Sequence, residues 1–270
     1  MTPLFNITDK EFELLRKLVY DSVGINLTEV KKPLLASRLS SRLRAYEFQT
    51  YLEYYEFVTR PENQDEKQIM IDFITTNETS FFREMVHFNF LQQKVLKEFE
   101  KDTIIRIWSA ACSSGEEPFS IGMMLASELN NRKRWEIIAS DISSRILDRC
   151  KRALYPMDKS EKIPEKYLKK YCLKGVRTNE GLFKISREIL DFIQFKQINL
   201  IEQIPNIGTF QVIFLRNVMI YFDKPTRKKI VNSLSQRLIS KGYLFIGHSE
   251  TLIDISDDFQ MILPTIYRKK

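Results

Sequence analysis

Histidine and cysteine are scarce in this chain of 270 residues, and each scarcity limits the chemistry available to the protein. The only histidines are His87 and His248, so a multi-histidine metal site is not expected, and any histidine-activated nucleophile must use one of these two. The three cysteines, Cys112, Cys150 and Cys172, are an odd number without Cys-x-x-Cys spacing, which predicts neither disulfides nor a zinc site. We therefore expect no metal and ordinary thiols.

Long apolar runs are also missing. No stretch approaches the roughly 20 apolar residues of a membrane-spanning helix, and the first residues lack the basic start and apolar centre of a secretory signal. We therefore expect a cytoplasmic protein that does not insert into the membrane. A hydrophobic content of 43% and a charged content of 29% are ordinary for a globular protein. No heptad repeat demands a dimer, so a monomer is expected.

Residues 1–84 predict a small all-α domain with a linker. Apolar residues recur at helical spacing, and Thr8 or Asp9 is a candidate N-cap for the first helix, which Gly24 is expected to end. The expected helices are Asp9 to Tyr20, Lys31 to Tyr46, Tyr51 to Val58 and Gln64 to Ile74.

The second of these helices carries a basic stripe. Arg38 and Arg42 flank its apolar positions, and Lys31, Lys32 and Arg44 are nearby without an acidic residue among them. One interpretation is a solvated helix face whose arginine stems cover apolar surface. The other is a docking stripe for an acidic protein helix. The net charge of +7 favours acidic partners in general, but its excess lies outside residues 1–85, which carry 11 Lys/Arg against 14 Asp/Glu.

Residues 85–270 change to alternating strands and helices, an order that predicts an α/β fold with a parallel sheet covered on both faces. Expected strands are 104–108, 136–139, 210–215, 243–246 and a last one near 261–267, and expected helices are 118–129, 143–153 and 226–239. Lys-rich sequence at 156–195 interrupts the alternation. Its two strand-like runs, 182–185 and 189–195, predict an inserted small β subdomain.

The most informative segment is Arg106 to Pro118, in which an apolar strand leads through small residues to two carboxylates. A strand that delivers a tight turn to a helix start is how open α/β sheets bind nucleotide-like ligands. The turn has one glycine, Gly115, and no P-loop lysine, so a pyrophosphate cradle is not expected. A cationic nucleoside fits better, because Glu116 or Glu117 would attract its positive groups. S-adenosylmethionine is such a molecule.

Asp141 ends the second expected strand, about 26 residues after Gly115, where doubly wound folds place the acid that binds ribose hydroxyls. Its alternative role is to cap the following helix. The polar and aromatic segment 75–84 lies at the domain junction, where loops commonly line ligand sites, although it also fits a capped helix start. His248 lies in Gly-His-Ser-Glu without a nucleophile elbow, which indicates a structural or site-lining residue, and His87 has no evident partner.

Taken together, six segments resemble the CheR-type chemoreceptor glutamate O-methyltransferases of bacterial chemotaxis. They are 76–84, 108–121, 139–142, 199–200, 215–223 and 242–250, and they occur in family order over almost the whole chain. The resemblance implies a Rossmann-like S-adenosylmethionine-dependent methyltransferase sheet after the small all-α domain. It also implies that the chain forms glutamate methyl esters on chemoreceptors, with S-adenosylhomocysteine as product.

The resemblance further assigns residues to roles. It implies that Arg83 and Tyr221 lie nearest the transferring methyl, and that the cofactor contacts are Asn77, Thr79, Arg83, Glu117, Asp141, Asn199, Leu200, Arg216 and Asn217. The implied partner is the cytoplasmic helical domain of a chemoreceptor, which the stripe of Arg38, Arg42 and Arg44 would attract. In some family members the inserted β subdomain also binds a receptor's C-terminal peptide.

This chemistry agrees with the scarcity of histidine. A glutamate side chain has a pKa near ~4.3, so it is already an anion at neutral pH and needs no general base. Other interpretations stay open from the sequence: a methyltransferase for another protein or a small acid, a basic nucleic-acid-binding protein, or an adaptor that senses the ligand without turnover. The basic residues are not interleaved with aromatics as in an RNA-binding module, so no nucleic acid is expected as partner.

Overall fold

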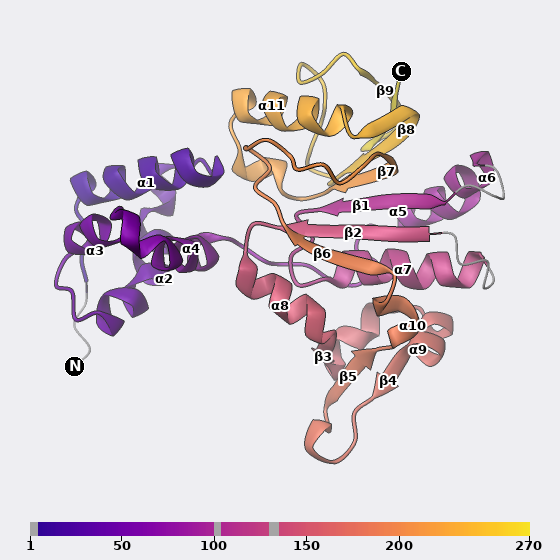
Figure 1. Cartoon of the computed structure of the whole chain (residues 1–270), viewed down its shortest axis with the longest axis horizontal. Helices are drawn as coiled ribbons and strands as arrows, with labels where there is room; N and C mark the ends of the chain where they lie inside the picture. The colour runs from indigo at the N-terminus through magenta and orange to yellow at the C-terminus, as the bar shows by residue number, and fades with distance from the viewer. Residues whose placement is uncertain (1–4, 100–103, 130–134) are drawn as a thin grey trace.

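The computed structural model describes residues 5–99, 104–129 and 135–270, which form a helical domain, a large sheet and a small inserted sheet (Figure 1). The helical domain contains α1 (Asp9–Val23), α2 (Lys32–Ala45), α3 (Tyr51–Val58) and α4 (Gln64–Ile74). Thr8 caps α1 in a capping box with Glu11, and Gly24 ends it with a left-handed φ of 74°. These local signals confirm the expected start and end of the first helix.

The helical domain has its own core. Its helices bury one apolar side each, and Phe12, Leu15, Leu39 and Leu43 are fully shielded from solvent. The segment after α4 is irregular and leads into α5 (Met85–Phe90), so residues 75–84 do not begin a helix. Glu84, immediately before α5, has a positive φ of 59°, and its carbonyl accepts from His87 N–H at 3.0 Å while its side chain makes no cap bond.

The large sheet has seven strands in the order β6-β2-β1-β7-β8-β10-β9. These are β6 (Ile193–Gln197), β2 (Trp135–Asp141), β1 (Ile105–Ala110), β7 (Phe210–Leu215), β8 (Leu238–Ile246), β10 (Ile266–Lys269) and β9 (Phe259–Leu263). The five strands from β6 to β8 are parallel to one another, and β10 is antiparallel to both of its neighbours, β8 and β9. The order reverses on either side of β1, which creates the crevice where such folds bind ligands.

Both faces of this sheet are covered, as the alternating pattern predicts. On one face, side chains such as Ile107 and Ile137 pack in a core that includes α7 (Glu116–Glu128) and α8 (Ser144–Arg152). On the other face, Trp108 and Ile213 pack in a core that includes α11 (Lys224–Ser235). None of the helices in the described ranges combines the length and apolar composition needed to cross a bilayer.

The inserted sheet projects from the large one in Figure 1 and has the order β3-β5-β4. Its strands are β3 (Leu154–Pro156), β5 (Leu182–Ile185) and β4 (Cys172–Lys174), with α9 (Glu165–Tyr171) between β3 and β4. The predicted run 182–185 is confirmed as β5. The run 189–195 was assigned wrongly to the insertion, because it contains the end of α10 (Arg187–Leu190) and the start of β6, which pairs with β2.

Two further boundaries differ from the expectation. The segment near 261–267 is a hairpin of β9 and β10, since a turn at Pro264 and Thr265 divides its apolar run. The helix expected at 226–239 is α11, which ends at Ser235, and β8 begins at Leu238. Leu238 and Ile239 fit either structure by apolar pattern alone, and pairing of Leu238 with Phe210 of β7 assigns them to the strand.

Candidate active site

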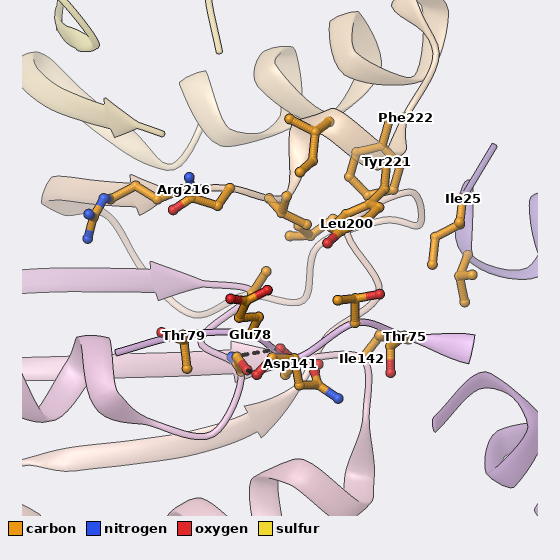
Figure 2. A pocket seen from close by; sticks show the side chains of 18 of the residues that line it. Ile25, Thr75, Glu78, Thr79, Asp141, Ile142, Leu200, Arg216, Tyr221 and Phe222 are labelled. Atoms are coloured by element: carbon orange, nitrogen blue, oxygen red, sulfur yellow. Dashed lines mark hydrogen bonds between the residues drawn. The ribbon is translucent and has the colours of Figure 1, made fainter. Parts of the chain in front are cut away.

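A pocket of about 380 Å³ lies between the helical domain and the carboxyl ends of β1, β2 and β7. Its volume is within the range of small-molecule sites. Figure 2 shows Leu200 and Arg216 on one side of this pocket and Thr79 and Asp141 on the other, with Ile25 of the helical domain at the far end. The pocket therefore occupies the crevice where the strand order reverses.

All residues that the resemblance assigns to cofactor and catalysis line this pocket. They are Asn77, Thr79, Arg83, Glu117, Asp141, Asn199, Leu200, Arg216, Asn217 and Tyr221. They come from five separate parts of the chain, which the fold brings together. The helical domain contributes further residues, among them Ile25, Leu34 and Arg38.

The turn after β1 is strongly bent where it forms the pocket wall. Ala111 and Ser113 have φ values of 62° and 50°, which non-glycine residues adopt at an energetic cost, and Gly115 has a φ of 94°. A Cβ at Gly115 would lie 2.9 Å from the Tyr155 hydroxyl, so glycine is required there for space as well as conformation. Ser113 Oγ donates to the carbonyl of Asn77 at 3.1 Å and joins this turn to the segment after α4.

The two adjacent carboxylates at the start of α7 have different surroundings. Glu116 is fully buried, pairs with Lys159 of the insertion and accepts from Ser114 Oγ at 2.5 Å. Glu117 lines the pocket, accepts from Ser109 Oγ at 2.7 Å and lies 2.8 Å from Arg216 Nη1. Burial raises the pKa of Glu117 despite the attraction of Arg216. Of the two, Glu117 is therefore the carboxylate that faces a ligand.

Asp141 does not cap the following helix, and two backbone N–H groups hold its carboxylate at the pocket wall. Its Oδ1 accepts from the backbone N–H of Ser143 at 3.0 Å, and its Oδ2 accepts from that of Ser113 at 2.9 Å. The helix cap itself is Ser143, whose hydroxyl accepts from Ile146 N–H. Burial raises the pKa of Asp141 although these backbone N–H groups oppose the rise. Each carboxylate oxygen has a second lone pair, which leaves capacity to accept a ligand hydroxyl in the pocket.

Arg216 joins two carboxylates in the pocket wall. Its side chain is only 2% exposed, and its Nη2 lies 3.1 Å from Glu84 Oε2 while Nη1 bonds Glu117. Burial works against ionisation of Glu84, but Arg216 and neighbouring donors lower its pKa overall. Glu84 also accepts from Asn217 Nδ2 at 3.3 Å. Sequence reasoning missed Glu84 as a site residue. Glu84 holds Arg216 in place, and no local sequence pattern indicates that contact.

Glu250 is a second residue that sequence reasoning left without a role. Its carboxylate accepts from the backbone N–H groups of Asn217, Met219 and Gly247 at 3.0, 2.7 and 2.6 Å. Burial raises the pKa of Glu250 against these bonds. Asn217 has a φ of 57°, a conformation that asparagine tolerates, and Glu250 stabilises it. In the sequence, the one signal that could have pointed to Glu250 was its position in the Gly-His-Ser-Glu segment.

The helical domain contacts the large sheet close to the pocket. Asn199 Nδ2 donates to the carbonyl of Ser22 at 2.8 Å, and Asn26 N–H donates to the carbonyl of Tyr221 at 2.8 Å. Arg83 Nη1 donates to the carbonyl of Glu78 at 3.2 Å. These bonds tie two lining residues, Asn199 and Tyr221, to the end of α1 and the segment after it.

The basic stripe on α2 is not a row of free charges. Arg42 makes two bonds to the buried carboxylate of Glu66, at 2.9 and 2.5 Å, and Lys32 pairs with Asp9. Arg38 lines the pocket and donates to the carbonyl of Ile74, and Arg44 is exposed. Arg42 is thus paired within the helical domain. Of the three arginines expected to dock a partner, only Arg38 and Arg44 remain candidates.

The expectation that His87 has no partner is wrong. His87 is fully buried, its Nε2 lies 2.8 Å from Thr265 Oγ1, and its Nδ1 lies 3.5 Å from Glu84 Oε2. Burial and the charge of Arg216 lower the pKa of His87 to about 3, so the imidazole is neutral. His248 lies on the other side of Glu84, with its Nε2 at 3.8 Å from the same oxygen.

Comparison with known proteins assigns both domains. Residues 10–75 match the family model of the CheR methyltransferase all-alpha domain, and residues 77–268 match that of the CheR methyltransferase SAM binding domain. The chain belongs to the CheR methyltransferase family. It is 39% identical to the chemotaxis protein methyltransferase of Borreliella burgdorferi, over 98% of this chain and 95% of that one. It is 37% identical to chemotaxis protein methyltransferase 2 of Pseudomonas aeruginosa, over 97% and 94% of the two chains.

The family confirms the Rossmann-like methyltransferase fold with a small all-α domain and identifies an S-adenosylmethionine-binding domain. The pocket chemistry fits this ligand. Glu117 and Asp141 offer carboxylate oxygens for an ammonium group and for hydroxyls, and Leu200 and Ile142 offer apolar surface for a base. The turn at Gly115 lacks the further glycines that a pyrophosphate would require. CheR-family membership and pocket chemistry therefore agree on a methyl-donor nucleoside.

Proposed function

We propose that this CheR-family methyltransferase transfers the methyl group of S-adenosylmethionine to glutamate carboxylates of chemoreceptors, in the cytoplasm. The observation that carries the proposal is the composition of the pocket. It gathers the residues assigned to methyl transfer, while neither histidine is among the described residues that line it. An acceptor that is already ionised needs no histidine as general base to remove a proton. A glutamate carboxylate meets this condition at neutral pH.

Each side chain in the proposal has one task. When bound, S-adenosylmethionine supplies an electrophilic methyl group on a sulfonium. Glu117 is assigned to the ligand's ammonium group and Asp141 to its ribose hydroxyls, with Asn77, Thr79 and Asn217 as further contacts. Arg83 steers the acceptor anion and Tyr221 orients it by a hydrogen bond. Exclusion of water and alignment then contribute most of the rate, because opposite charges cancel during transfer.

The helical domain is proposed to receive the receptor. Receptor methylation regions are expected to be helical and rich in glutamate, and Arg38 lies in the pocket lining at the side of α2. Arg44 is exposed farther along the same helix. Opposite charge across such an interface increases the rate of encounter and selects partners more than it tightens the complex. Loss of these charges should therefore act on the Michaelis constant for the receptor.

The inserted sheet is proposed as a second receptor contact, for an extended C-terminal peptide. Strand β4 is at the edge of this sheet, so its outer backbone groups are available for strand addition. Leu173 and Val176 beside that edge are 61% and 69% exposed, which gives a peptide apolar surface to contact. Peptide binding to an insertion-deleted chain and to the full chain would separate this contact from methyl transfer.

The test of the proposed function is methylation of receptor-containing membranes with radiolabelled S-adenosylmethionine, followed by alkaline treatment. We expect label on the receptor that base releases as methanol, because carboxyl esters are base-labile. Asp141→Asn is the matched variant that should lose labelling. Base-stable label, or label on nucleic acid or on a small acid instead of the receptor, would contradict the assigned acceptor.

A further inference from the structure

The two histidines of the chain meet at one carboxylate, although more than half of the chain separates them. Glu84 precedes α5, His87 lies in α5, and His248 follows β8. Glu84 Oε2 lies 3.5 Å from His87 Nδ1 and 3.8 Å from His248 Nε2, and one ligand atom from each residue falls within 4.8 Å of the others. The two imidazole rings are 5.4 Å apart at 83°.

The contacts around His87 favour one tautomer of its imidazole. Its Nε2 is 2.8 Å from Thr265 Oγ1, and that hydroxyl donates its own proton to the carbonyl of Pro264 at 2.6 Å. With the hydroxyl proton on that carbonyl, the hydroxyl accepts from His87, which is the tautomer with the imidazole proton on Nε2. The other nitrogen, Nδ1, carries a lone pair and is buried without a hydrogen-bond partner in the described part of the chain.

In this tautomer the Nδ1 lone pair faces a carboxylate oxygen of Glu84 across 3.5 Å. Two acceptors in this arrangement repel each other, and a buried polar atom without a partner is costly. A cation between them would remove both penalties. His248 Nε2 completes a set of two imidazole nitrogens and one carboxylate oxygen, and such a donor set suits zinc and similar transition metals.

We propose that Glu84, His87 and His248 bind a divalent transition-metal ion of the zinc type, with an open coordination position toward solvent. In a tetrahedral zinc site, ligand atoms lie about 3.3 Å apart, close to the two separations measured from Glu84 Oε2. The side chain of His248 is 56% exposed, so its ring can turn inward and the ion can enter. Thr265 holds the His87 ring in the required tautomer, as residues beyond the first ligands usually do.

Arg216 does not prevent this site. Its guanidinium lies 3.1 Å from Glu84 Oε2 but also bonds Glu117 at 2.8 Å, so one cation faces two carboxylates and leaves one negative charge for a metal ion. A carboxylate has about four lone-pair positions and can serve both cations. The proposal departs from the expectation of no metal, which rested on counting histidines and not on where the fold places them.

The test is titration of the chelator-treated full-length chain with Co²⁺, followed by displacement with Zn²⁺. We expect one Co²⁺ per chain, visible d–d absorption of a low-coordinate site, and no thiolate charge-transfer band, since the ligands are nitrogen and oxygen. No saturable Co²⁺ binding would overturn the proposal. A thiolate band would also overturn it, because it would place the ion on a cysteine.

Two variants sharpen the result. His248→Ala removes one ligand from an exposed position and is expected to weaken Co²⁺ affinity at least about tenfold. Asp254→Asn, an exposed carboxylate on the following loop, should leave the affinity unchanged. Equal affinities in the two variants would overturn the site. S-adenosylhomocysteine binding to His248→Ala, measured by calorimetry, shows that the chain is folded and keeps the metal result independent of methyl transfer.

Discussion

Each domain contains a cluster of an arginine and a buried carboxylate, and the two clusters use the same chemical groups for different purposes. In the helical domain, Arg42 bonds Glu66 at 2.9 and 2.5 Å, and the hydroxyls of Tyr46 and Tyr54 bond the same carboxylate. In the methyltransferase domain, Arg216 lies between Glu117 and Glu84. Only the second cluster borders the pocket.

The comparison teaches that a buried ion pair does not by itself identify a functional site. Glu66 and Arg216 are 4% and 2% exposed, so burial does not distinguish the clusters. What differs is the neighbouring space: Glu66 has two tyrosine hydroxyls and Arg42 around it, while Glu117 has a ligand-sized pocket on one side. Substitutions in the first cluster should therefore change stability alone, and those in the second should change ligand binding too.

The largest effect is expected for Arg216→Met. It leaves Glu117 and Glu84 buried without their cation, which costs about 3–5 kcal/mol of unfolding free energy in comparable sites. Glu117 in the pocket wall also loses the partner that fixes its position. The affinity for S-adenosylhomocysteine, measured by calorimetry, should therefore fall about 100-fold. Arg237→Met, on an arginine that bonds the carbonyl of Ile204 away from the pocket, is the control. Unchanged affinity in Arg216→Met would show that the Arg216 cluster does not support ligand binding.

Arg42→Met should lower stability without changing ligand affinity. Glu66 would lose its charge partner but keep two tyrosine donors, so we expect a loss of about 3 kcal/mol in urea unfolding. Affinity for S-adenosylhomocysteine should stay within about twofold, since Arg42 is not among the described residues that line the pocket. Arg44→Met, an exposed neighbour, should change stability by less than about 0.5 kcal/mol. A large loss of affinity in Arg42→Met would show that the helical cluster supports the pocket.

These two clusters also show what the sequence could and could not predict. Helix α1 was predictable because Thr8, Glu11 and Gly24 are local signals. The turn at Gly115 and the acid at Asp141 were predictable because spacing along β1 and β2 is fixed by the fold. The pairing of Arg42 with Glu66, the assignment of 193–197 to the large sheet and the meeting of Glu84 with both histidines depend on contacts distant in sequence, which no local pattern encodes.

Tyr221→Phe separates catalysis from binding within the pocket. If the hydroxyl orients the acceptor, its removal should lower kcat about tenfold, or about 1.4 kcal/mol, and leave affinity for S-adenosylhomocysteine nearly unchanged. Methylation rate at saturating receptor and calorimetry measure the two quantities. Tyr20 donates its hydroxyl proton to Asp223 at 2.9 Å, and Tyr20→Phe is the matched control, which should leave kcat unchanged. Loss of ligand affinity in Tyr221→Phe would assign this residue to binding instead.

Glu11→Gln is expected to have the smallest effect, and its pH dependence tests the helical domain alone. Burial would raise the pKa of Glu11, but bonds from Thr8 and Leu52 lower it below the ordinary value of 4.5. Since the folded pKa is depressed, the stabilisation is present above about pH 4.5 and is lost as pH falls through the folded pKa. At pH 7 the variant should lose about 1 kcal/mol, as for other helix caps.

At pH 3 the same comparison should give a smaller difference than at pH 7, because the lower pH protonates more of the native carboxylate, which then resembles the amide. Urea unfolding of both chains at the two pH values measures this change. Glu13→Gln, in the same helix with only an exposed partner in Arg16, should differ little at either pH. An equal difference for Glu11→Gln at pH 7 and pH 3 would mean that Glu11 stabilises α1 by its shape and not by its charge.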